Sequence, residues 1–111
     1  MSATLANVSL DDKYTLESGR VYLSGIQALV RLPLDQVRRD RAAGLNTGGF
    51  VSGYRGSPVG TYDDALWAAQ DHLARHNVRF QSGLNEDLAA TAVWGSQQVG
   101  LYPSAQVDGV C

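Results

Sequence analysis

The chain has 111 residues, of which 44% are hydrophobic and 18% are charged, and its formal net charge is −2. This length holds one domain, and the composition differs from that of disordered and membrane-embedded proteins. The slightly acidic balance argues against nucleic acid as a partner, and no run reaches the ~20 apolar residues of a membrane-spanning helix. The amino terminus lacks the pattern of a secretory signal, and the single Cys111 cannot form an internal disulfide. We therefore expect a cytoplasmic protein without a membrane partner.

The first part of the chain predicts a polar lead segment, residues 1–19, with a short extended piece at residues 14–16. A domain of residues 20–111 follows it. The sequence Val107-Asp108-Gly109-Val110-Cys111 is typical of a strand that enters a core. Such a strand needs partners for its edge and its apolar face, so we expect the domain to be truncated and the chain to be a fragment of a longer protein.

Two helices are predicted next. Ser24 is an N-cap residue before an apolar helical pattern that meets Pro33. Proline lacks the N–H that a helix interior needs, so we expect a break near residues 31–32. Pro33 then opens a second helix over residues 34–43, which Gly44 ends. We expect the cations near its carboxyl end to form a solvated face, as the helix dipole favours; they are Arg38, Arg39 and Arg41.

The middle of the chain alternates strands and helices. Residues 50–52 predict a short buried strand. Residues 62–75 predict a helix, and Asn77 after it stops the helix. Residues 78–81 predict the next strand. The predicted helix carries an apolar stripe of Ala65, Leu66, Ala69 and Leu73, with Asp63 and Asp64 off the stripe.

The last predicted elements are a helix over residues 88–99 and the strand over residues 107–111. The helix consists of small and apolar residues, so we expect it to be buried on more than one face. Asn85 is its expected N-cap. Helices that alternate with strands in this order predict an α/β fold with a parallel sheet and crossover helices.

Two loops bring reactive side chains to the ends of these strands. The first reads Gly53-Tyr54-Arg55-Gly56-Ser57-Pro58, and the second reads Asn85-Glu86-Asp87. Because both follow parallel strands, they belong to the sheet edge where ligands bind in open α/β folds. Each residue also has a plainer interpretation. Ser57 can cap the next helix, Glu86 can be an ordinary first-turn acid, and Arg55 can pair with an acid or with a substrate carboxylate.

With these two loops and the run Thr91-Ala92-Val93-Trp94-Gly95-Ser96, the chain resembles the amino-terminal part of the indolepyruvate:ferredoxin oxidoreductase family. These enzymes use thiamine diphosphate to oxidise 2-oxo acids. The likeness covers about residues 20–111 and is greatest to the long single-chain form, whose turn also reads Gly-Tyr-Arg-Gly-Ser-Pro. The two-subunit relatives carry Gly-Tyr-Pro-Gly-Thr-Pro there, so Arg55 and Ser57 depart from them.

The resemblance implies an incomplete pyrimidine-binding domain, with Glu86 as the catalytic acid beside N1′ of the aminopyrimidine ring. We expect Glu86 to face an apolar pocket, where desolvation favours the protonated form of a carboxylic acid. It further implies that Ser57, Arg55 and Tyr54 border the substrate and that Gly56 and Pro58 contribute to cofactor binding. The whole enzyme would convert a 2-oxo acid and coenzyme A to acyl-coenzyme A and pass electrons to ferredoxin, as a homo-oligomer. The diphosphate with Mg²⁺, and any iron–sulfur cluster, would lie outside this chain, since one cysteine cannot ligate a cluster. Asp87 is expected to face solvent.

A second hypothesis is a small α/β binding or interaction module in which Glu86 and Ser57 serve only as caps. His72 and His76 have the spacing of metal ligands on a helix, but no third ligand is evident, so we expect two exposed histidines and no metal site. Trp67 and Trp94 are expected in core or interface packing, although Trp94 is close enough to Glu86 to line its pocket.

Overall fold

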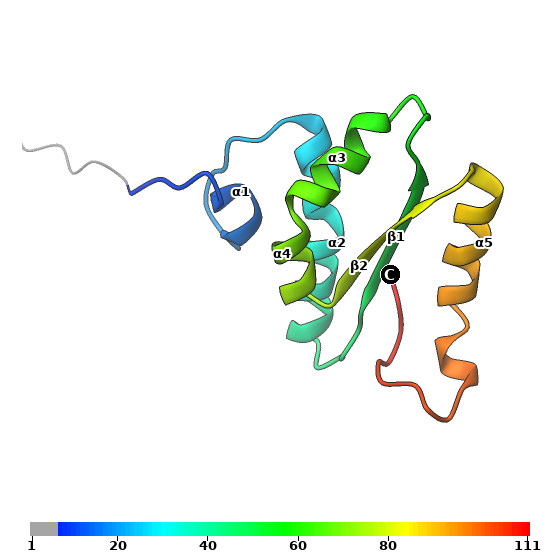
Figure 1. Cartoon of the computed structure of the whole chain (residues 1–111). Coiled ribbons are helices and arrows are strands. Elements are labelled where there is room, and N and C mark those ends of the chain that lie inside the picture. Colours follow the sequence, from blue (N-terminus) through cyan, green and yellow to red (C-terminus); the bar gives the residue numbers. More distant parts are fainter. Residues whose placement is uncertain (1–6) are drawn as a thin grey trace, which may run out of the picture.

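The computed structural model describes residues 7–111 and shows an α/β arrangement (Figure 1). In chain order the elements are α1 (Asp12–Thr15), α2 (Gly25–Ala42), β1 (Gly49–Tyr54), α3 (Gly60–Ala68), α4 (Gln70–Arg75), β2 (Val78–Gly83), α5 (Glu86–Ser96) and the 3₁₀ turn η1 (Val99–Leu101). Part of the predicted lead segment, residues 1–6, lies outside the described residues. No helix over residues 7–111 is long and apolar enough to cross a membrane.

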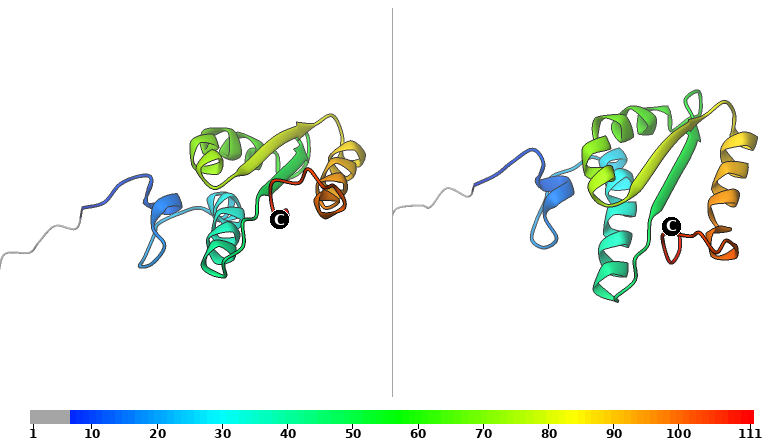
Figure 2. Two further views of the ribbon diagram at one scale, coloured as in Figure 1. Left: turned by 90° about the horizontal axis from the view of Figure 1, so that it is seen from below. Right: turned by 60° about the horizontal axis from the view of Figure 1, so that its bottom comes forward.

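Strands β1 and β2 form a two-stranded parallel sheet, in register from Gly49 opposite Val78 to Tyr54 opposite Gly83. Helices α3 and α4 make the crossover between the strands. Figures 1 and 2 show α2, α3 and α4 on one side of the strands and α5 on the other. The predicted α/β class with parallel strands and a helical crossover is confirmed.

The core lies between α2, the crossover helices and the sheet. Val30, Leu34 and Val37 of α2 are fully buried, and they meet the buried side chains of the crossover. The expected stripe is confirmed there, since Leu66, Ala69 and Leu73 are all buried. The helix predicted over residues 62–75 is instead two helices, α3 and α4, and the first of them begins at Gly60. Ala69 separates them, because its φ of −100° and ψ of 10° depart from helical geometry.

The break expected near residues 31–32 was wrong, because α2 is one helix of 18 residues with Pro33 inside it. Ser24 caps it as predicted and forms a reciprocal capping box with Gln27. Pro33 leaves the carbonyl of Leu29, four residues earlier, without its helical donor. The Tyr62 hydroxyl of α3 donates to that carbonyl at 3.1 Å. A tertiary hydrogen bond thus replaces the one that proline removes.

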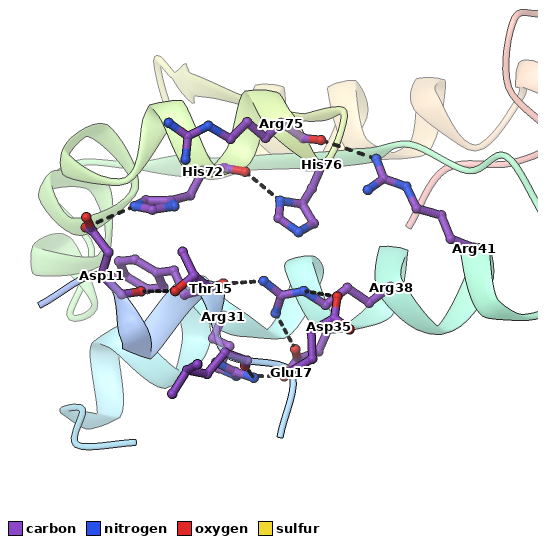
Figure 3. Close-up of polar contacts among 12 residues, drawn as sticks. Asp11, Thr15, Glu17, Arg31, Asp35, Arg38, Arg41, His72, Arg75 and His76 are labelled. Carbon is purple, nitrogen blue, oxygen red and sulfur yellow. Dashed lines mark hydrogen bonds and ion pairs between the residues drawn. The ribbon is translucent and has the colours of Figure 1, made fainter. Parts of the chain in front are cut away.

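Only Leu16 of the expected extended piece at residues 14–16 is extended, because Tyr14 and Thr15 belong to the short helix α1. Its carbonyl groups are held from α2: Arg31 donates to the Lys13 and Leu16 carbonyls, and Arg38 donates to the Tyr14 carbonyl (Figure 3). The Arg38 side chain is only 12% exposed and pairs with Asp35 at 2.7 Å. The expectation of a solvated basic face was therefore wrong for Arg38.

His72 of α4 and His76, which follows the helix, are half-buried rather than exposed. His72 lies 3.3 Å from an Asp11 carboxylate oxygen, and its ring centre is 5.3 Å from that of Tyr14 (Figure 3). The His76 Nδ1 lies 2.8 Å from the His72 carbonyl, and burial lowers the pKa of His76. His72 therefore helps to dock α1, and His76 helps to end α4. Among the described residues, no group of three or more His, Cys, Asp or Glu side chains could hold a metal ion.

The carboxyl-terminal elements differ most from expectation. Helix α5 ends at Ser96, and only Ala89 of its residues is buried, so the helix is not covered on several faces. The strand predicted over residues 107–111 is reduced to one parallel bridge between Val110 and Gly48. The short sheet offers α5 too little surface to bury more than one narrow face.

The replacement of the missing helical hydrogen bond gives a first prediction. Tyr62→Phe should lower the free energy of unfolding by about 1 kcal/mol, because the Leu29 carbonyl then lacks a donor. In a Pro33→Ala background, alanine supplies the N–H and the cost of Tyr62→Phe should shrink. Urea unfolding of the four proteins measures this coupling. Equal costs in both backgrounds would show that Tyr62 does not compensate for Pro33.

Candidate functional site

The carboxyl ends of both strands meet at one edge of the sheet, as the sequence predicts. Tyr54 and Gly83 are the last residues of the ladder and lie opposite each other. The loops that follow them face an open groove of about 490 Å³. Glu86, Ser57 and Tyr54 line this groove together, so the structure unites three of the predicted site residues.

The groove depends on the close approach of α5 to the end of β2. A Cβ atom on Gly83 would lie 2.8 Å from the Ala89 Cβ and 3.2 Å from the Asn85 carbonyl oxygen. A larger residue would therefore push α5 away from the sheet. Asn85 caps the helix as predicted, because its side chain accepts a hydrogen bond from the Leu88 N–H at 2.9 Å. These contacts fix the place of Glu86, the next residue.

Glu86 is exposed to solvent at the start of α5. The expectation of a desolvated acid is therefore not met in this structure. One wall beside it is apolar, and that wall consists of Ala89, Ala90, Val93 and Trp94. Asp87 is also exposed, as predicted, but it does not line the groove. The helix thus presents one of its two first-turn acids to the groove and the other away from it.

Ser57 is half-buried and lines the groove, but it does not cap a helix. Helix α3 begins at Gly60 after Val59, and it has no side-chain cap. The Ser57 backbone instead shapes the turn, since its N–H donates to the Tyr54 carbonyl and its carbonyl accepts from the Gly60 N–H. The capping interpretation of Ser57 was therefore wrong, and the residue lines the groove instead.

Arg55 pairs with acids of its own chain. Its Nε lies 3.2 Å from Asp63 and its Nη2 lies 3.6 Å from Asp64, while the side chain is 73% exposed. Arg55 does not line the groove, and neither do Gly56 and Pro58. A Cβ atom on Gly56 would lie 2.6 Å from the Tyr54 ring, so this glycine makes room for Tyr54 rather than touching the groove itself.

Two tryptophans are more exposed than expected. Trp94 is 67% exposed on the groove wall, and Trp67 is 47% exposed with its ring edge against Phe80 at a centroid distance of 5.3 Å. Sequence reasoning also missed Asp63, which it placed off the apolar stripe although the side chain is 7% exposed. The apolar pattern carries no signal for Asp63, because its burial depends on Arg55 and on the fold of the turn.

Comparisons with protein-family models, curated proteins and solved structures find no match for this chain. The description of the site therefore rests on its geometry. A second large cavity, of about 500 Å³, lies at the opposite end of the sheet and is lined by residues such as Asn46, Gly49 and Arg79. None of the predicted site residues lines that cavity, so the groove beside Glu86 is the candidate site.

The different roles of Ser57 and Asn85 can be measured. Ser57→Ala should change the free energy of unfolding by less than about 0.5 kcal/mol, since no helix cap is lost. Asn85→Ala should cost about 1 kcal/mol, because the Leu88 N–H loses its acceptor. Urea unfolding of both variants checks this. A Ser57→Ala cost equal to that of Asn85→Ala would restore a structural role for the hydroxyl.

Proposed function

We propose that this chain is the pyrimidine-binding part of a thiamine-diphosphate-dependent 2-oxo acid:ferredoxin oxidoreductase and works within a longer polypeptide. The observation that supports this most is the meeting of Glu86 with Ser57 and Tyr54 in one groove at the carboxyl edge of the parallel strands. Ligands of open α/β sheets bind at this edge. In this proposal the two strands belong to the larger parallel sheet of a thiamine-diphosphate-binding fold.

The groove suits a planar heterocycle. Its walls combine the small side chains of Ala89 and Ala90 with the rings of Trp94 and Tyr54, and it carries one carboxylate. Bound thiamine diphosphate supplies the carbanion chemistry of such an enzyme. The protein has to supply an acid beside the ring, a shaped pocket and the exclusion of water. The groove residues meet the first two requirements.

Glu86 is the proposed acid. A ring that covers the open groove removes water from the carboxylate, and desolvation favours its protonated form. The acid can then share a proton with N1′ of the ring.

Ser57 and Tyr54 are the proposed substrate contacts. Their side chains border the groove on the side of β1, opposite the helix that carries Glu86. A hydroxyl that caps no helix is available to a carboxylate or carbonyl of a 2-oxo acid. The diphosphate, Mg²⁺, coenzyme A, ferredoxin and any iron–sulfur cluster are assigned to other parts of the whole enzyme.

The alternative, a non-catalytic interaction module, has support of its own. Leu84 and Leu88 are 84% and 51% exposed around the start of α5, and Trp94 is 67% exposed on the groove wall. Exposed apolar side chains in such a group are typical of a surface that contacts another protein. The two hypotheses differ in whether Glu86 has a chemical role, so the experiment concerns that residue.

Glu86→Gln in the complete enzyme should slow exchange of the cofactor's C2 proton at least tenfold. Tenfold corresponds to about 1.4 kcal/mol on the barrier. The reason is that glutamine cannot donate a proton to N1′ and recover it. Because glutamine keeps the volume of glutamate, the fold should stay intact. The measurement is exchange followed by NMR at matched cofactor occupancy, with circular dichroism as the check on folding.

Asp87→Asn is the matched control, because Asp87 is an acid of the same helical turn that does not line the groove. Its exchange rate should equal that of the unchanged enzyme. A normal rate in Glu86→Gln, with slow exchange in Asp87→Asn, would mean that the wrong acid has been chosen. Normal rates in both variants would favour the interaction module.

A further inference from the structure

Asp63 is a carboxylate that the fold buries without fully satisfying it. The side chain is 7% exposed in the first turn of α3. Its Oδ2 lies 3.2 Å from Arg55 Nε, whereas its Oδ1 is out of contact with solvent and has no hydrogen-bond partner among the described residues. A buried oxygen without a donor is costly, and such an atom in a folded protein calls for an explanation.

Asp63 lies in the wall of a small chamber of about 170 Å³. Other parts of the wall are apolar and include Val51, Leu66 and Phe80. The chamber lies on the α3 side of β1 and the groove that holds Glu86 lies on the α5 side, and four residues line both spaces: Ser52, Gly53, Tyr54 and Ser57. The chamber therefore adjoins the candidate site at the end of β1, with a carboxylate among apolar walls.

The size of the chamber limits its occupant. An apolar cavity of ~150 Å³ holds one benzene ring, so this chamber has room for a single ring or a group of that size. The pairing with Arg55 already balances the charge of Asp63. What the carboxylate still lacks is a donor to its second oxygen, and a neutral N–H or O–H provides one without adding another buried charge.

We propose that the chamber binds a single ring, or a group of that size, that carries an N–H or O–H donor and pairs with Asp63. Because Oδ1 is closed to solvent in this structure, the carboxylate has to turn about its χ2 torsion, which is broad and soft, to meet the donor. In the proposed function this group is the side chain of the 2-oxo acid. That identification rests on the proposed function, whereas the donor preference of the chamber does not.

The test compares phenol, anisole and toluene as probes of the ¹⁵N-labelled chain. All three share one ring, but only phenol donates a hydrogen bond. Dissociation constants come from the backbone shifts of the residues that line the chamber. Phenol should bind at least fivefold more tightly than anisole and toluene. Equal affinities for the three probes, or no binding at the chamber, would overturn the proposal.

Two variants assign the preference to Asp63. Asp63→Leu removes the acceptor, so phenol and anisole should then bind within twofold of each other. Asp64→Leu is the matched control, because Asp64 also pairs with Arg55 but does not line the chamber. It should keep the phenol preference. A preference that persists in Asp63→Leu, or is lost in Asp64→Leu, would overturn the assignment.

A third variant keeps the test decisive even if Asp63→Leu fails to fold. Gly53 lines the chamber, and a Cβ atom placed on it meets no atom within 4 Å. Gly53→Leu should therefore fold and block the chamber, with affinity for phenol reduced at least tenfold. Unchanged phenol binding would place the ligand elsewhere. None of these measurements uses thiamine, so they are independent of the proposed function. If phenol binds preferentially and Glu86→Gln exchanges the C2 proton at the normal rate, the ligand proposal for the chamber stands and the proposed function is rejected.

Discussion

The parallel, in-register pairing of β1 with β2 is the constraint on which the candidate site depends. Tyr54 and Gly83 end the ladder opposite each other, so the loops that follow leave the sheet side by side. A slip of one residue would turn each side chain of one strand to the other face and would separate the loops. The absence of a side chain at Gly83 then lets α5 approach closely enough for Glu86 to reach the groove.

Helix α2 supports this pairing from one side of the sheet. Its buried side chains Val30, Leu34 and Val37 meet the crossover helices, and burial of such side chains is the main stabilising contribution in a domain of this size. The helix stays continuous through Pro33 because the crossover itself returns the lost hydrogen bond, from Tyr62 to the Leu29 carbonyl. The same contact therefore joins the integrity of α2 to the position of α3, and α3 carries Asp63.

Charged groups in this fold help to hold α1 and the turn after β1 in place. Arg31 and Arg38 donate hydrogen bonds to carbonyl groups at the end of α1 (Figure 3). Arg55 pairs with the buried Asp63. Arginine suits this use because its planar group offers several donors in a fixed arrangement. The ion pair between Arg55 and Asp63 thereby holds the turn between β1 and α3 against α3. Gly56 in this turn makes room for the Tyr54 ring.

The sequence by itself determined the α/β class, the parallel order of the strands, the N-caps at Ser24 and Asn85 and the apolar stripe of the crossover. These features depend on local spacing and on residues a few positions apart, which a linear pattern records. It also determined that Glu86 and Ser57 belong to one sheet edge, since parallel topology alone requires this.

The tertiary structure decided what depends on distant contacts. Tyr62 keeps α2 unbroken at Pro33, and the short sheet leaves α5 and Glu86 exposed. Arg55 turns Asp63 into a buried group beside the groove, because its charge is balanced only when the turn after β1 folds back onto α3.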